Sequence, residues 1–220
     1  MTRRTVVLAG LLSWAAATGL QAQGPPAAGN APRAGKVFIS GENPVIRLLD
    51  KADGTALAQV SFWRVHWSPA GRGHVCYLTV GEPGAAGTVR VALTDNRRLL
   101  DYLTKEMLGT FNKSYIDQPY TPVEGATFGA SGDSAKEHRE QCRSSQYNVE
   151  LIWRDMQTPG LIDIAAGSRP TNPFGLTYLR IPAGSASIVV NGKAAPGQAF
   201  PGTGGANPTA FLAFGETWLK

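Results

Sequence analysis

The sequence predicts a mainly β domain, either an antiparallel β-barrel or a two-sheet sandwich, with one main amphipathic helix over about 96–108 and a short helix over about 135–142. Three observations support this fold class. Segments that alternate between apolar and polar residues recur along the chain. Glycine, proline, asparagine and aspartate separate these segments at short intervals. Strong helical periodicity is confined to one stretch, which favours a meander of strands.

The first 35 residues differ in composition from the rest. Residues 1–23 contain Arg3 and Arg4, an apolar run and then Gln-Ala-Gln, which is the order of a secretory signal peptide. Residues 24–35 are rich in proline, glycine and alanine and predict a flexible tether. We expect a periplasmic or secreted bacterial protein with a single β-rich domain at 36–220 and no membrane span in the mature chain. The arginine pair leaves both the general and the twin-arginine export routes open.

Charge and cysteine content restrict the function classes. The net charge of +5 falls when the two leader arginines are removed, and no basic cluster is interleaved with aromatic residues, so we expect no nucleic-acid partner. Cys76 and Cys142 predict an intramolecular disulfide bond in an oxidising compartment, with two small buried thiols as the alternative. Neither metal-ligand spacing nor a cofactor motif occurs, so we expect no metal and no cofactor.

The strands of the first half are expected at Lys36–Ser40, Val45–Asp50, Thr55–Trp67, His74–Val80 and Thr88–Leu93. An Asp-Gly pair in the turn Lys51–Gly54 predicts a tight hairpin. Within the third strand, the stretch Gln59–Trp67 has two different faces. We assign its bulky face to the core: Ser61, Trp63, Val65 and Trp67.

The other face of Gln59–Trp67 is mixed: Val60, Phe62, Arg64 and His66. Burial of Arg64 without a partner would cost several kcal/mol, so its guanidinium must meet water, a carboxylate or an anionic ligand. Antiparallel sheets commonly have one solvated face. The mixed face is therefore either a half-solvated surface or the polar end of a ligand pocket.

The helix follows at Thr94–Gly109. Its apolar residues share one face at helical spacing: Leu99, Leu100, Leu103 and Met107. We expect Asp95 to cap its first turn and Gly109 to end it in the left-handed conformation. Further along, Ser134–Glu137 matches a capping box and predicts the start of the short helix.

The second half contains further predicted strands, and Asn191–Gly192 predicts a type I′ turn between Ala186–Val190 and Lys193–Ala195. These strands are Ala126–Ser131, Gln146–Asp155, Leu161–Ala165, Leu176–Ile181, Ala186–Val190, Lys193–Ala195 and Thr209–Leu219. In Gln146–Asp155 the alternation places Val149, Leu151 and Trp153 on the same apolar face.

The leading functional hypothesis is an exported protein that binds a small organic ligand, anionic or aromatic, in a partly apolar pocket. Its candidate polar contacts and walls are Arg64, His66, Glu150, Arg154, Phe62 and Tyr147. The sequence leaves open whether the protein is an enzyme, because it contains no complete catalytic motif.

Two alternatives belong to other classes. The first is a cofactor-independent lyase, isomerase or hydrolase with His66 or His74 as the general base and Glu150 as a carboxylate partner. For this site, His66 and His74 would lie opposite each other on consecutive strands. The second alternative is a polysaccharide- or protein-binding surface module that uses exposed tryptophan and tyrosine side chains.

Overall fold

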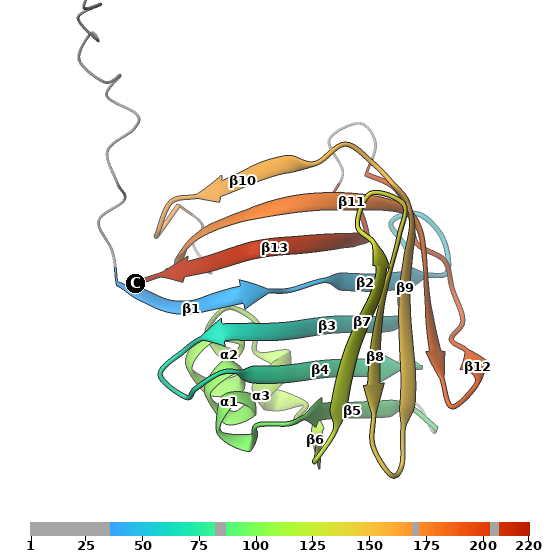
Figure 1. The fold of residues 1–220 in the computed structure, drawn as a ribbon, viewed down its shortest axis with the longest axis horizontal. Helices are drawn as coiled ribbons and strands as arrows, with labels where there is room; N and C mark the ends of the chain where they lie inside the picture. Colours follow the sequence, from blue (N-terminus) through green and yellow to red (C-terminus); the bar gives the residue numbers. More distant parts are fainter. Residues whose placement is uncertain (1–35, 82–86, 169–171, 203–206) are drawn as a thin grey trace, which may run out of the picture. The chain divides into compact units, whose positions relative to one another are not determined.

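The computed structural model describes residues 36–81, 87–168, 172–202 and 207–220. The predicted signal peptide (1–23) and tether (24–35) lie outside the described residues. The described chain is mainly β, as the sequence predicts (Figure 1). Its strands are β1 (Val37–Glu42), β2 (Val45–Leu49), β3 (Ala56–Trp67), β4 (Gly73–Val80), β5 (Val89–Thr94), β6 (Thr121–Glu124), β7 (Thr127–Asp133), β8 (Glu137–Arg143), β9 (Asn148–Met156), β10 (Gly160–Ile164), β11 (Gly175–Val190), β12 (Lys193–Ala194) and β13 (Ala210–Leu219).

Hydrogen bonds join these strands into one 13-stranded sheet with the main path β6-β5-β4-β3-β1-β13-β11-β9-β8-β7. The long strand β11 changes partners along its length. Up to Pro182 it pairs with β13 and β10, and from Ala183 it pairs with β9 and β12. The sequence predicted two separate strands here, but the chain stays extended across the change of partners. Pro182 lies at this change, where a residue without an N–H is tolerated.

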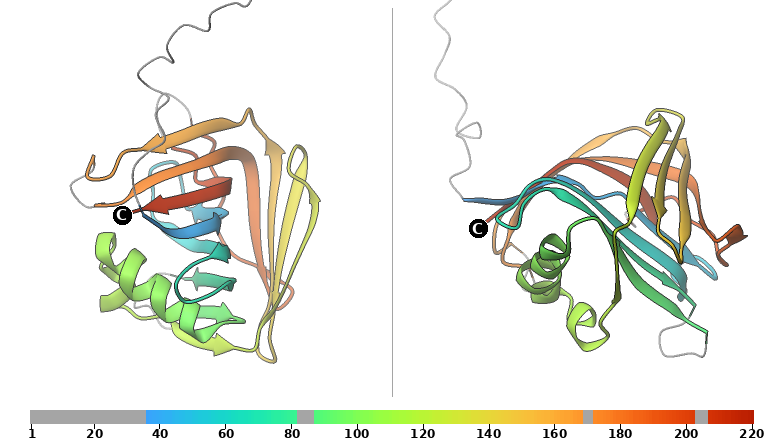
Figure 2. Two further views of the ribbon diagram at one scale, coloured as in Figure 1. Left: turned by 60° about the vertical axis from the view of Figure 1, so that its left-hand side comes forward. Right: turned by 60° about the horizontal axis from the view of Figure 1, so that its bottom comes forward.

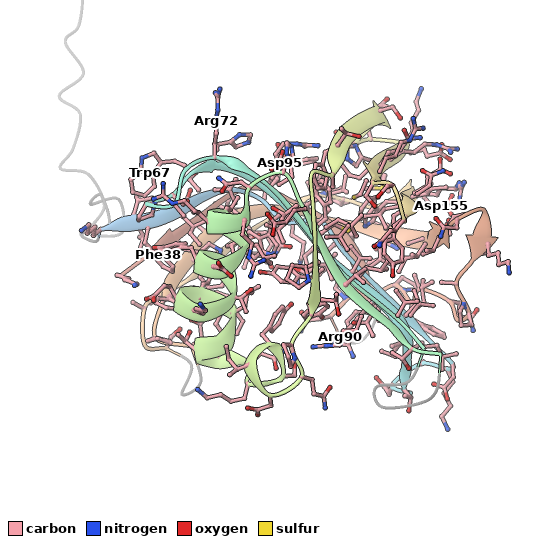
Figure 3. All side chains as sticks on the ribbon, turned by 90° about the horizontal axis from the view of Figure 1, so that it is seen from below. Phe38, Trp67, Arg72, Arg90, Asp95 and Asp155 are labelled. Carbon is pink, nitrogen blue, oxygen red and sulfur yellow. The ribbon has the colours of Figure 1, made fainter. Side chains whose placement is uncertain are left out.

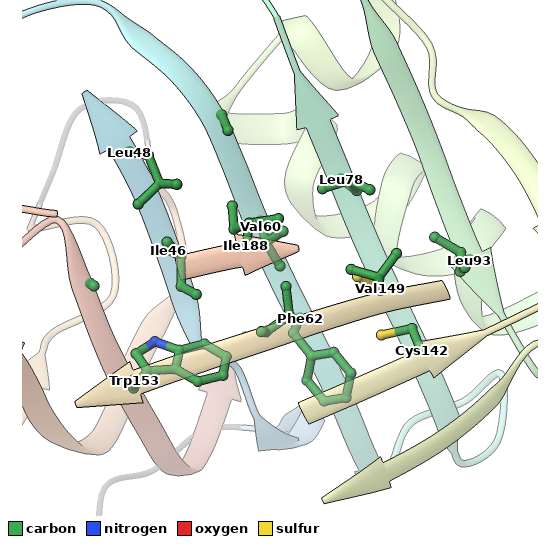
Figure 4. Packing of buried hydrophobic residues seen from close by; sticks show 14 of the residues in the cluster. Ile46, Leu48, Val60, Phe62, Leu78, Leu93, Cys142, Val149, Trp153 and Ile188 are labelled. Carbon is green, nitrogen blue, oxygen red and sulfur yellow. The ribbon is translucent and has the colours of Figure 1, made fainter. Parts of the chain in front are cut away.

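The strand β11 thus divides the sheet into two halves. The large half contains β1 to β6, β10, β13 and the first part of β11, and the small half contains β7, β8, β9, β12 and the rest of β11. An apolar cluster lies between the halves (Figure 4), and its members include Ile46, Val60, Phe62, Leu78, Leu93, Cys142, Val149, Leu151 and Trp153. The predicted apolar face of the strand at 146–155 is therefore confirmed as core.

A helical segment covers the opposite face of the large half (Figure 2). It consists of α1 (Arg97–Tyr102), the π-helical stretch η1 (Leu103–Leu108), α2 (Gly109–Phe111) and, after a turn, α3 (Ser114–Asp117). The predicted apolar stripe is confirmed, because Leu99, Leu100, Leu103 and Met107 are all buried. They pack in a second apolar cluster with Trp63, Tyr77 and Trp218 of the sheet.

The ends of this helix differ from the prediction. Asn96, rather than Asp95, caps the first turn, because its side chain accepts a hydrogen bond from the Leu99 amide at 3.1 Å. Asp95 instead accepts hydrogen bonds from the backbone and ring of His74. Gly109 has a φ of −66°, so it continues the helix instead of ending it. The helical path therefore extends to Phe111.

The two faces of Gln59–Trp67 also differ from the prediction. Trp63 and Val65 are buried as expected, but Trp67 is 49% exposed, so its assignment to the core was wrong. On the mixed face, Val60 and Phe62 are buried because the small half of the sheet packs on them, whereas His66 near the end of the strand is exposed. In its middle part the strand lies between two apolar layers, so alternation there separates one core from the other.

The predicted short helix at about 135–142 is wrong, because residues Glu137–Arg143 form strand β8. The segment alternates with a period of two: His138, Glu140 and Cys142 are buried, while the residues between them are partly exposed. Cross-strand ion pairs stabilise this arrangement, including Arg139 with Glu150 at 2.7 Å. Tertiary packing thus overrides a local capping signal.

The predicted turns are confirmed. Asp53 has a φ of 59° in the turn between β2 and β3. Asn191 and Gly192 have φ values of 51° and 78° between the paired residues Val190 and Lys193, and two positive φ values are those of a type I′ turn. Residues that accept a positive φ therefore occupy both turns.

Candidate functional site

A cavity of about 300 Å³ lies between the large half of the sheet and the C-terminal end of the helical segment. Its floor comes from β2, β3, β11 and β13, and its roof comes from the end of the helix and the loop that contains α3. The residues that line it are Asn43, Val45, Arg47, Gln59, Val60, Ser61, Trp63, Leu108, Phe111, Asn112, Ser114, Tyr115, Tyr120, Leu176, Tyr178, Phe211, Glu216 and Trp218. Apolar and aromatic walls with a few polar groups are typical of small-molecule sites.

A β-bulge in β13 directs Glu216 into this cavity. Phe211 lines the cavity, and strict alternation would place every odd-numbered residue of the strand on the same side. However, Gly215 has a φ of 60°, and the pairing of β13 with β11 shifts in register there. Glycine adopts this conformation readily. Beyond the bulge the even-numbered residues Glu216 and Trp218 line the cavity.

Glu216 is a buried carboxyl, with 3% of its surface exposed. Burial raises its pKa to about 8, although hydrogen bonds to Trp218 and Asn43 oppose the shift. The indole nitrogen of Trp218 donates to Oε1 of Glu216 at 2.6 Å. The carboxyl is therefore mostly protonated at neutral pH, and it has a pKa at which it can donate or accept a proton.

A chain of hydrogen bonds leads across the cavity floor to Glu216. The indole nitrogen of Trp63 donates to Oγ of Ser61 at 3.0 Å, and this hydroxyl donates to Oδ1 of Asn43 at 3.0 Å. Asn43 in turn hydrogen-bonds Glu216. The chain orients Asn43, one of the two side chains that hydrogen-bond the carboxyl.

Tyrosine side chains form the roof. The ring centroids of Tyr115 and Tyr120 lie 5.5 Å apart, and both rings contact Tyr77. The guanidinium carbon of Arg90 (labelled in Figure 3) lies 3.8 Å from the Tyr120 ring centroid, and the same group donates to the carbonyl of Ser114. Burial raises the pKa of Tyr115 above its ordinary range. Arg90 therefore ties the roof to the sheet.

A second cavity of about 600 Å³ adjoins the first, and Tyr115 and Tyr120 line both spaces. Its other walls come from α1, η1 and the segment that leads into β6, including Leu100, Thr104 and Pro122. No group of three or more potential metal ligands occurs in the described ranges.

Arg64, predicted to contact a ligand, instead connects the two halves of the sheet. Its guanidinium donates to Glu42 and, at 2.7 and 2.8 Å, to both carboxylate oxygens of Glu140. Glu140 is fully buried and also lies 2.9 Å from the ring of His138. Phe62, predicted as a pocket wall, packs in the first apolar cluster. Neither Arg64 nor Phe62 lines the cavity.

The other predicted site residues are spread over the small half and its surroundings. Glu150 pairs with Arg139 at 2.7 Å, and Arg154 pairs with Glu137 at 2.6 Å. Both predicted site residues therefore lie in partly exposed ion pairs. Tyr147 packs at the margin of the first apolar cluster. The structure therefore does not bring these residues together with Arg64 in one pocket.

The two candidate bases are also separated. The side chain of His66 is 59% exposed and lies 3.8 Å from Glu42. His74 lies opposite Arg64 in the pairing of β3 with β4, so the expected juxtaposition of His66 and His74 is wrong. Nδ1 of His74 lies 2.7 Å from Asp95, and its ring stacks on Phe128 with centroids 4.7 Å apart.

Cys76 and Cys142 are free, fully buried thiols on facing strands of the two halves. Burial raises the pKa of Cys142 well above its ordinary value, and the thiol of Cys76, which hydrogen-bonds it, raises that pKa further. The structure thus has the predicted alternative of two small buried thiols, and the disulfide bond between them stays a prediction.

The sequence interpretation missed Glu216, the only carboxyl that lines the cavity among the described residues. The signal for it was present. A single acidic residue directly follows a glycine inside an otherwise apolar strand, Ala210–Leu219. A carboxyl in that setting must be exposed, paired or neutral, because an isolated buried charge is costly.

Comparisons with protein-family models, with curated proteins and with solved structures find no match to this chain. In the described part of the chain, every helix is too short or too polar to cross a bilayer.

Proposed function

We propose that this protein binds a small, partly apolar organic molecule in the cavity between β13 and the helical segment. The observation that carries the proposal is Glu216, a neutral carboxyl in the wall of an aromatic-lined space. A cavity with apolar walls, a few convergent polar groups and one strongly shifted pKa is the usual form of a binding site.

The hydrogen bonding of Glu216 supports a ligand that accepts a hydrogen bond. Among the described residues its partners are Trp218 and Asn43, and both hydrogen bonds favour the ionised form of the carboxyl, as donors do. The proton of the neutral form is therefore available to an acceptor in the cavity. A buried donor without an acceptor costs about 1–3 kcal/mol, which favours a ligand carbonyl, ether or hydroxyl oxygen at this position.

Two other predictions belong to this proposal. We infer a two-sheet sandwich rather than a closed barrel, because the end strands β6 and β7 do not pair with each other and an apolar cluster lies between the halves. We also infer export to the periplasm or the medium, for which the leader at residues 1–23 is the support.

Titration with N-phenyl-1-naphthylamine, a neutral fluorescent ring compound, tests the binding function. We expect saturable binding at one site per chain. Val45→Trp places an indole in the cavity and should weaken binding by about ten-fold or more, because the probe and the new side chain occupy the same space.

The matched control is Val37→Trp, which adds the same side chain at an exposed position of β1. It should leave the affinity within about two-fold, since isolated surface changes have small effects. Chemical denaturation of each variant establishes that it is folded. Saturable binding that Val45→Trp leaves unchanged, or the absence of saturable binding, would contradict the proposed function.

A further inference from the structure

We propose that the natural ligand is a ring-bearing organic anion, whose oxyanion binds Arg47 at the mouth of the cavity while its ring system lies over the aromatic floor. This inference rests on the proposed function and adds the chemical class of the ligand. The ligand's charged group would bind one arginine, and its ring system would contact the apolar walls.

The charge of the cavity supports an anion. Among the described residues that line it, Arg47 is the only basic side chain and Glu216 the only acidic one, and Glu216 is mostly protonated at neutral pH. Arg47 is exposed, and no carboxylate in the described part of the chain pairs with it. The binding space therefore has an uncompensated positive charge at its mouth.

The spacing of the polar groups supports an elongated ligand. Val45 and Arg47 lie on the same side of β2, Asn43 lies in the connection just before this strand, and all three line the cavity. Asn43, which hydrogen-bonds Glu216, and Arg47 are four residues apart, and extended chain of this length spans about 13 Å. The backbone at Arg47 therefore lies about this far from the Glu216 end of the cavity. Val45 and Phe211, which are directly paired, lie between these ends. A ring system can occupy this middle part while its two polar ends reach Arg47 and Glu216.

A second arginine lies on the same face. Leu176 and Tyr178 line the cavity, so alternation places Arg180 on this face two residues further along β11. Arg180 donates to Oδ1 of Asn207 at 3.1 Å and has no carboxylate partner among the described residues. By contrast, Arg139 and Arg154 of the small half are both paired with glutamates. Guanidinium groups without carboxylates near a cavity are well suited to an oxyanion.

Two related probes separate this inference from the proposed function. 1-Anilinonaphthalene-8-sulfonate and N-phenyl-1-naphthylamine share one ring system and differ by a sulfonate. A purely apolar cavity would bind the neutral compound more tightly, because the sulfonate must lose water. At low ionic strength we expect the wild-type protein to bind the sulfonate about ten-fold more tightly than the neutral probe, with the preference declining as salt is added.

Arg47→Met should abolish this preference, because it removes the guanidinium that the sulfonate contacts. Arg72→Met is the matched control, because Arg72 is an exposed arginine in the turn before β4 that points away from the rest of the fold (Figure 3). It removes the same charge and should keep the preference. Equal affinity of the wild-type protein for both probes, or equal losses in Arg47→Met and Arg72→Met, would overturn the anion inference alone. Failure of both probes to bind would overturn the proposed function, and this inference with it.

Discussion

Arg64→Met should lower the free energy of unfolding by ~3–5 kcal/mol, because a buried carboxylate loses the guanidinium that pairs with both of its oxygens. Glu140 is fully buried and receives two hydrogen bonds from the guanidinium of Arg64. Although burial alone lowers the pKa of Arg64, Glu140 and Glu42 raise it above its ordinary value, so the arginine stays charged in the fold. Urea denaturation at pH 7 measures the loss.

A double-mutant cycle tests the cause of this loss. In Arg64→Met with Glu140→Gln, the uncompensated charge is gone, so the double variant should be more stable than Arg64→Met alone. Arg139→Met is the control, since its partly exposed ion pairs should contribute about 1 kcal/mol or less. If Arg64→Met costs no more than Arg139→Met, or if the two changes at 64 and 140 are additive, Arg64 does not hold the halves together as described.

Glu216→Gln should remove a large pH dependence of stability. The carboxyl titrates near 4.5 when unperturbed and at about 8 in the fold. Between these values the unfolded chain has released a proton that the folded chain retains, so the free energy of unfolding falls as the pH rises. The contribution is fully present below about pH 4.5 and is lost by about pH 8, at a slope of roughly 1 kcal/mol per pH unit.

Denaturation of both proteins at a series of pH values measures this contribution. The stability of the wild-type protein relative to Glu216→Gln should fall by roughly 3–5 kcal/mol from pH 4.5 to pH 9. Glu150→Gln, in a partly exposed ion pair, controls for a general effect of removing a carboxyl and should show no such trend. A constant difference between wild type and Glu216→Gln would mean that Glu216 is ionised in the fold.

Local sequence signals predicted much of the fold. The turns at Asp53 and Asn191 depend on residues that accept a positive φ, and the helix depends on a leucine stripe, so each is specified by a few neighbouring residues. The prediction failed at β8, where the alternation of His138, Glu140 and Cys142 was overlooked in favour of a capping signal. It also failed at Trp67, which extends beyond the region that the helix covers.

The candidate site was far less predictable. It depends on the bulge at Gly215 and on the contact of Asn43 with Glu216, two residues that are distant in sequence and meet only when β13 lies beside β1. Arg64 was expected to need a carboxylate, water or a ligand, and the carboxylate proved to be Glu140 on β8, whose strand character was not predicted. Non-local strand pairing therefore decided which polar groups face a cavity and which cross-link the fold.

A small molecule bound between β13 and the helical segment would lie against tryptophan side chains, so their indole N–H resonances report directly on binding at this site. Trp63 and Trp218 line the cavity, whereas Trp153 lies in the cluster between the halves and Trp67 is exposed. Titration of ¹⁵N-labelled protein with N-phenyl-1-naphthylamine should shift the resonances of Trp63 and Trp218 and leave that of the exposed Trp67 in place. Shifts confined to Trp67 or Trp153, or no shifts at all, would contradict the proposed site.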